Sequence, residues 1–168
     1  MDISRRRFFK PSLRNNTEPH LPWLKQPEQF TRDCTRCGKC VESCETNIIA
    51  LGDGGFPTVH FEKDECTFCY QCADVCPENL FLDRSLPPWN IKASIADSCL
   101  ANKNVECRSC SESCEPMAIQ FKLQVGKVAE PRLSLEDCSG CGACVSVCPT
   151  SSIKVSNVNQ NEKSYVSE

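Results

Sequence analysis

The sequence predicts a small α+β protein of two tandem modules, in which short helices and small hairpins surround groups of cysteines. The 168-residue chain contains 16 cysteines, and they fall into four runs of four. The interval from Cys34 to Cys66 nearly equals that from Cys107 to Cys138, which indicates one supersecondary unit used four times. Between the runs of each half, short apolar stretches flank glycine-containing turns, a pattern typical of hairpins.

Three of the four runs share one spacing, Cys-x2-Cys-x2-Cys-x3-Cys. The third run keeps the end of this pattern and places seven residues between its first two cysteines. The first run is Cys34, Cys37, Cys40 and Cys44; the second is Cys66, Cys69, Cys72 and Cys76; the third is Cys99, Cys107, Cys110 and Cys114; the fourth is Cys138, Cys141, Cys144 and Cys148.

This spacing is typical of [4Fe–4S] binding, in which soft thiolate ligands occupy the iron corners of a cube. Zinc ribbons and fingers place two close pairs of cysteines a dozen or more residues apart, and disulfides need an oxidising compartment. The sequence therefore predicts three [4Fe–4S] clusters at the regular runs and a fourth at the irregular run. Cysteine makes up a large share of the apolar residues, so little else is available to build a core. We therefore expect the metal-free chain to be largely unfolded.

The predicted domain boundaries follow the runs. Within the modules we expect hairpins at 48–61 and 119–135, and a helical turn after the third cysteine of a run, as at 41–43 and 73–75. The full division is a basic N-terminal tail (1–29), a two-cluster ferredoxin-like module (30–84), a proline-rich linker (85–98), a second such module (99–156) and a polar C-terminal tail (157–168). Trp89, in the linker, is expected either to cover the interface between the modules or to anchor a partner.

The charge balance argues against a nucleic-acid-binding protein. The formal net charge is −3, and sixteen thiolates holding four 2+ clusters would bring it to about −11. A catalytic triad, a nucleotide fingerprint and an apolar stretch long enough to span a membrane are all missing from the sequence. We therefore expect an electron-carrying or accessory protein rather than an enzyme.

The N-terminal tail is basic on an otherwise acidic chain. Residues 4–10, Ser-Arg-Arg-Arg-Phe-Phe-Lys, resemble a twin-arginine export motif, but a polar, proline-broken stretch follows where an export signal needs 7–15 apolar residues. Export is therefore not expected. Two interpretations remain open: a solvated basic tail, or a docking peptide that uses Arg5, Arg6 and Arg7.

The order of an arginine-rich start, two regular runs, a stretched run and a final regular run resembles the NapF family, the ferredoxin-type accessory proteins of periplasmic nitrate reductase systems. The most specific stretches are Phe-Cys-Tyr-Gln-Cys at 68–72, Val-Glu-Cys-Arg-Ser-Cys at 105–110 and Cys-Glu-Pro-Met-Ala-Ile at 114–119.

The resemblance implies a soluble, cytoplasmic protein that contacts the catalytic subunit of periplasmic nitrate reductase before that subunit is exported. We expect the protein to be a monomer. Its implied role is cluster-dependent maturation of this subunit, with electron supply to the nitrate reductase system as the alternative. By analogy with two-cluster ferredoxins, the last cysteine of each run would serve the neighbouring cluster. The implied ligand sets are Cys34, Cys37, Cys40 and Cys76; Cys44, Cys66, Cys69 and Cys72; Cys99, Cys107, Cys110 and Cys148; and Cys114, Cys138, Cys141 and Cys144.

Overall fold

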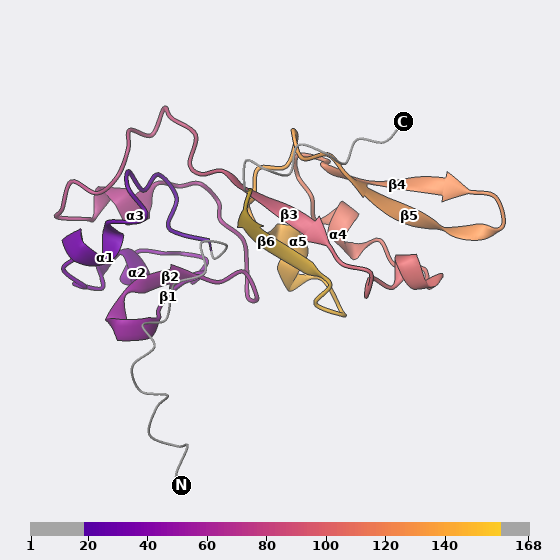
Figure 1. The fold of residues 1–168 in the computed structure, drawn as a ribbon, viewed down its shortest axis with the longest axis horizontal. Helices are drawn as coiled ribbons and strands as arrows, with labels where there is room; N and C mark the ends of the chain where they lie inside the picture. The colour runs from indigo at the N-terminus through magenta and orange to yellow at the C-terminus, as the bar shows by residue number, and fades with distance from the viewer. Residues whose placement is uncertain (1–18, 159–168) are drawn as a thin grey trace, which may run out of the picture.

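The computed structural model describes residues 19–158 and places two modules side by side along the long axis of the molecule (Figure 1). The first module contains three helices of one turn, two short strands and a 3-10 turn between the strands. Its elements are α1 (Phe30–Asp33), α2 (Lys39–Glu42), β1 (Ile49–Leu51), η2 (Asp53–Gly55), β2 (Pro57–Val59) and α3 (Gln71–Asp74).

The second module repeats this plan with longer strands. Its elements are β3 (Ile91–Ile95), η3 (Ala101–Lys103), α4 (Ser109–Glu112), β4 (Ile119–Gln124), β5 (Lys127–Leu133), α5 (Ala143–Ser146) and β6 (Ile153–Asn157). The chain therefore has the α+β character that the sequence predicts, with small sheets and helices too short to be stable by themselves.

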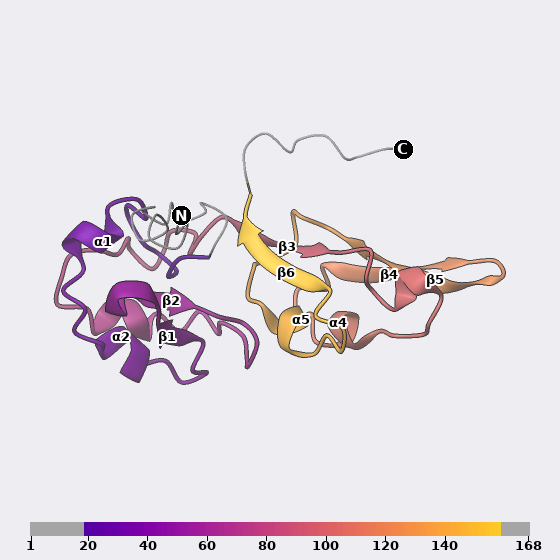
Figure 2. The same cartoon turned by 60° about the horizontal axis from the view of Figure 1, so that its bottom comes forward.

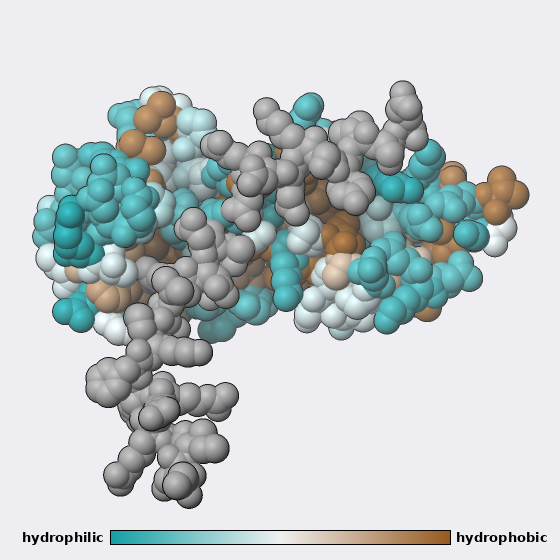
Figure 3. Space-filling view, viewed as in Figure 1, coloured by the Kyte–Doolittle hydropathy of each residue, from teal (hydrophilic) through white to brown (hydrophobic). Residues whose placement is uncertain are grey.

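Both predicted hairpins are present. Strands β1 and β2 pair antiparallel with Ile49 opposite Val59, and β4 and β5 pair with Ile119 opposite Leu133. Hairpin β4–β5 projects from the body of the second module in both ribbon views (Figures 1 and 2). The space-filling view shows apolar atoms at its tip (Figure 3), where the Leu123 and Val125 side chains are exposed.

The helical turns begin earlier than the sequence predicts. Helices α2 and α3 include the third cysteine of their runs, Cys40 and Cys72, instead of following it. Each starts after a residue with a left-handed backbone, Gly38 (φ 78°) or Tyr70 (φ 73°). This left-handed residue reverses the chain between the second and third cysteines, so the helix begins as soon as the loop has turned.

A third sheet, which the sequence does not predict, joins β3 to β6. Strand β3 lies within residues 85–98, which were assigned to a linker, and pairs with the end of the second module from Ile91–Asn157 to Ile95–Ile153. Apolar residues alternate with polar ones along both strands, and Ile91, Ala93, Ile153 and Val155 are buried. The second module therefore includes the second half of the predicted linker.

Residues 19–29, assigned to the tail, pack against the first module. Leu21, Trp23 and Leu24 are all buried, and Leu24 forms a single antiparallel bridge with Phe81. This bridge occupies the same place in the first module as β3–β6 does in the second: a segment before the first run pairs with one after the second run. None of the helices formed by residues 19–158 has the length and apolar character that crossing a membrane requires.

Trp23 ties the N-terminal segment to the linker and to the second run. Its indole Nε1 donates a hydrogen bond to the Leu86 carbonyl at 2.8 Å, and its ring makes edge contacts with Phe68 and Tyr70 at centroid distances of 6.3 and 5.0 Å. The side chain is 4% exposed.

We predict that Trp23→Ala lowers the free energy of unfolding by about 3–5 kcal/mol, because it leaves a cavity and an unpaired carbonyl. Anaerobic thermal denaturation of the cluster-loaded protein measures the change. Leu123→Ala, at an exposed position of similar apolar character, is the control and should change the midpoint little. Equal midpoints for Trp23→Ala and the control would contradict the prediction.

Candidate iron–sulfur sites

The three regular runs share one backbone conformation. In each, the residue before the second cysteine and the residue after it both have positive φ: Arg36 and Gly38, Phe68 and Tyr70, Gly140 and Gly142. Two left-handed residues around one cysteine curl the chain, so that the cysteines on either side face the inside of the same loop. The spacing recognised in the sequence thus corresponds to a repeated loop geometry.

The third run reaches its arrangement by a different path. Arg108, which follows its second cysteine, has φ −133° instead of a positive value. The seven residues between Cys99 and Cys107 include the turn η3, which ends at Asn104, whose left-handed backbone (φ 63°) reverses the chain. The Asn104 side-chain oxygen accepts a hydrogen bond from the Val128 N–H at 3.1 Å, which fixes the insertion to β5. Cys99 is therefore held by an ordered loop.

In the first module, cysteines of the two runs meet in two spatial sites. The pKa of the Cys40 thiol is raised to about 11 by burial and by the neighbouring thiols Cys34, Cys37 and Cys76. Burial and the thiols of Cys66, Cys69, Cys40 and Cys44 raise the pKa of Cys72 to about 12. We call Cys34, Cys37, Cys40 and Cys76 the first site. The second site is Cys44, Cys66, Cys69 and Cys72, which line one cavity.

The second module repeats the arrangement. Burial and the nearby thiols of Cys99, Cys107 and Cys148 raise the pKa of Cys110 to about 11. Burial and the thiols of Cys141, Cys138 and Cys114 raise the pKa of Cys144 to about 12. We call Cys99, Cys107, Cys110 and Cys148 the third site. The fourth site is Cys114, Cys138, Cys141 and Cys144, which line one cavity. These groups of neighbouring thiols correspond to the ligand sets that the resemblance implies, and their role as cluster ligands stays a prediction.

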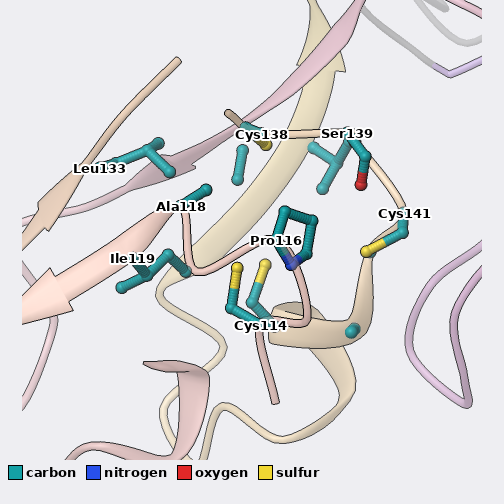
Figure 4. A pocket seen from close by; sticks show the side chains of 14 residues that line it. Cys114, Pro116, Ala118, Ile119, Leu133, Cys138, Ser139 and Cys141 are labelled. Atoms are coloured by element: carbon teal, nitrogen blue, oxygen red, sulfur yellow. The ribbon is translucent and has the colours of Figure 1, made fainter. Parts of the chain in front are cut away.

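Two of the sites surround apolar cavities. All four cysteines of the fourth site line one cavity together with Pro116, Ala118 and Ile119, and Figure 4 shows Cys114, Cys138 and Cys141 around it. All four cysteines of the second site line another, with Trp23, Phe68 and Tyr70 forming part of its wall. The aromatic residues that flank Cys69 therefore both shield this site and pack against Trp23.

The chemistry of these sites fits an iron–sulfur cluster. All sixteen cysteines are free thiols. A thiol whose pKa is raised to about 12 by burial stays protonated near neutral pH unless a positive charge compensates its ionisation. Iron supplies that charge, and four thiols around one apolar cavity offer one ligand for each corner of a cube.

Two side chains outside the cysteine runs, Lys92 and Trp89, contact the fourth run; the sequence singles out Trp89 but not Lys92. Lys92 Nζ donates a hydrogen bond to the Cys138 carbonyl at 2.5 Å, so a cation lies beside the fourth site. The Trp89 Nε1 donates to the Ser139 carbonyl at 3.1 Å, and its ring contacts Phe61 and Phe68. Trp89 thus covers the interface between the modules. The alternation of apolar and polar residues at 91–95 was the one local signal that could have placed Lys92 on a strand.

The predicted docking residues Arg5, Arg6 and Arg7 lie outside the described residues. All sixteen predicted cysteines lie inside them.

Comparison with known proteins agrees with this geometry. A 4Fe-4S dicluster domain family matches residues 33–80 and again residues 105–152, one match for each module. The chain is similar to the ferredoxin-type protein NapF of Escherichia coli K12, with 44% identity over 91% of this chain and 94% of the relative. It is similar to NapF of Haemophilus influenzae, with 42% identity over 96% of this chain and 98% of the relative. The methylamine utilization ferredoxin-type protein MauM of Methylophilus methylotrophus is 30% identical over 74% of this chain and 63% of its own length. The protein binds [4Fe–4S] clusters, and the chain belongs to the NapF family of ferredoxin-type proteins.

Proposed function

We propose that this chain is a four-cluster polyferredoxin that assists maturation of the catalytic subunit of periplasmic nitrate reductase in the cytoplasm, before export, by supplying it with electrons. The observation that carries the proposal is the grouping of all sixteen thiols into four sites. Each site would hold one [4Fe–4S] cluster, with the four cysteines of that site as its ligands. When bound, such clusters accept and donate single electrons.

The way each site is built favours electron supply over donation of iron and sulfide. Every site takes three cysteines from one run and the last cysteine from another. Releasing a cluster would therefore unlink two segments of the chain at once, and because ligation is coupled to folding it would destabilise the module. Electron transfer needs no such opening.

The surface of the described residues suits a carrier that docks on a larger protein. The bound clusters leave the body of the protein acidic, and the first site has an exposed ligand, Cys37. The tail that contains Arg5, Arg6 and Arg7 adds a basic segment, which would bind an acidic region of the catalytic subunit. The names of the NapF relatives and the resemblance to accessory proteins of nitrate reductase support this choice of partner.

We predict that Cys99→Ser and Cys107→Ser each remove about 4 of about 16 iron atoms per chain, because both thiols belong to the third site. Anaerobic iron and acid-labile sulfide assays on the purified proteins measure the loss. Cys34→Ser, in the first site, is the reference for a ligand of a regular run. If Cys99→Ser keeps the iron content of the unmodified protein, Cys99 is not a ligand.

The partner proposal is tested by anaerobic affinity purification from the cytoplasm. We predict that the unexported catalytic subunit co-purifies, and that replacing Arg5, Arg6 and Arg7 together by alanine weakens its binding about tenfold, a loss of about 1.4 kcal/mol. The control replaces the exposed Lys122, Lys127 and Lys154 by alanine, which removes the same charge from the body of the protein. Iron content should be unchanged in both variants.

The maturation role is tested separately, by deleting the protein from the cell. Deleting the protein should lower the activity and cofactor content of nitrate reductase at an unchanged level of its catalytic subunit. Normal cofactor content with slowed electron delivery would instead identify an electron donor without a maturation role. Absence of the catalytic subunit from the purification, with the clusters intact, would refute the partner.

A further inference from the structure

The second and fourth sites meet across the boundary between the modules. The Cys66 main-chain N–H donates a hydrogen bond to the Cys141 carbonyl at 2.8 Å, and these two cysteines belong to the second and fourth sites. A direct main-chain bond thus joins two cluster-binding loops from different modules.

Gly142 makes this contact possible. It follows Cys141, and a Cβ atom added there would lie 2.1 Å from Cδ1 of the Phe61 ring. Phe61 belongs to the first module, lies five residues before Cys66 and is 5% exposed. The ring therefore fills the space that any side chain at position 142 would need.

The corresponding positions of the other regular runs show that the loop itself does not demand a glycine. Gly38 holds the same place in the first run, with φ 78° against 88° for Gly142, and a Cβ there would meet no atom within 4 Å. Tyr70 holds it in the second run with φ 73° and carries a large side chain. What distinguishes Gly142 is the ring of Phe61.

Trp89, in the linker, packs against the same boundary between Phe61 and the fourth run. Its ring makes edge contacts with Phe61 and Phe68 at centroid distances of 6.0 and 5.8 Å, while its Nε1 bonds to the Ser139 carbonyl. The residue between Cys138 and Cys141 on this side, Gly140, is pressed against Ile91, whose carbonyl oxygen would lie 2.5 Å from an added Cβ. The fourth run is thus fixed on one side by the first module and on the other by β3.

The first and third sites are connected to this boundary through cysteine runs that they share with the second and fourth sites. The first run supplies Cys40 to the first site and Cys44 to the second, one turn later. The third run likewise supplies Cys110 to the third site and Cys114 to the fourth. The connections between sites therefore run first to second, second to fourth, and fourth to third.

We propose that Gly142, Phe61 and Trp89 are positioning residues that hold the second and fourth sites face to face, so that the four sites form one electron-transfer path through both modules. The proposal rests on the four-cluster function proposed above. Each transfer across the boundary moves one electron, oxidising one site and reducing the other, with no bond made or broken. A one-electron reductant supplies the electron. Because electron tunnelling weakens steeply with separation, the closeness of these two loops decides whether the modules conduct as one unit.

The test compares Gly142→Ala with Gly38→Ala, which imposes the same left-handed backbone on alanine without a steric clash. Both proteins are purified anaerobically, and their iron content and binding of the catalytic subunit are measured. Hydrogen exchange at the Cys66 amide reports the contact, and electron paramagnetic resonance of the dithionite-reduced protein reports magnetic interaction between clusters. We expect Gly142→Ala to raise amide exchange at Cys66 at least tenfold and to weaken the interaction between clusters at full iron content. Gly38→Ala should change neither reading.

A second variant, Gly142→Ala combined with Phe61→Ala, separates positioning from local damage. Removing the ring should restore part of the Cys66 protection and of the magnetic interaction. If Gly142→Ala loses iron and the double variant does not regain it, Gly142 serves its own loop and the proposal is overturned. Increased exchange at Cys66 with an unchanged spectrum also overturns it. Fewer than four clusters in the unmodified protein would instead defeat the four-cluster function itself.

Discussion

The structure depends on one constraint: each site takes three cysteines from one run and the fourth cysteine from another. A single turn of helix separates the third and fourth cysteines of a run, so one run cannot close its own site. Two runs must therefore pack against each other before either site is complete, and contacts between α2 and α3 and between α4 and α5 follow from this need. Cluster ligation and folding are therefore coupled in such a module.

The small apolar core agrees with that dependence. Among the described residues, Cys72, Cys110, Cys138 and Cys144 belong to the same buried core as Leu21, Ile48 and Ile91. Thiols placed there are expensive to ionise, as the raised pKa of Cys72 and Cys144 shows. Clusters held by these thiols would offset this cost and would contribute to the cores of the two modules as buried side chains do.

The sequence predicted the repeated cysteine loops better than it predicted the fold around them. The repeated cysteine spacing indicated which residues belong together, because it records a local loop conformation that the three regular runs do share. The hairpins were predictable from alternation and turn residues.

The pairing of β3 with β6 was missed because Pro87 and Pro88 made the whole stretch resemble a linker. Burial of Trp23 was missed because the basic residues before it dominated the composition of the tail. The meeting of Cys66 with Cys141 joins segments of different modules, and no local pattern encodes such a contact.

The segments that the sequence left outside the modules are those that orient one module relative to the other. The Trp23 N–H donates to the Pro88 carbonyl at 2.5 Å, its carbonyl accepts from the Leu82 N–H at 2.6 Å, and its indole bonds to Leu86. These bonds hold both ends of the stretch from Leu82 to Pro88 against the first module, and the two prolines that follow Leu86 restrict the path that remains. Trp89 therefore begins at a fixed point on the first module, and its side chain joins Phe61 of that module to Ser139 of the second. With a flexible linker the modules could separate, and every contact between them would form only at the cost of the linker's conformational entropy. A fixed one makes the contact between Cys66 and Cys141 part of the folded structure, which is the condition under which two dicluster modules can act as one carrier.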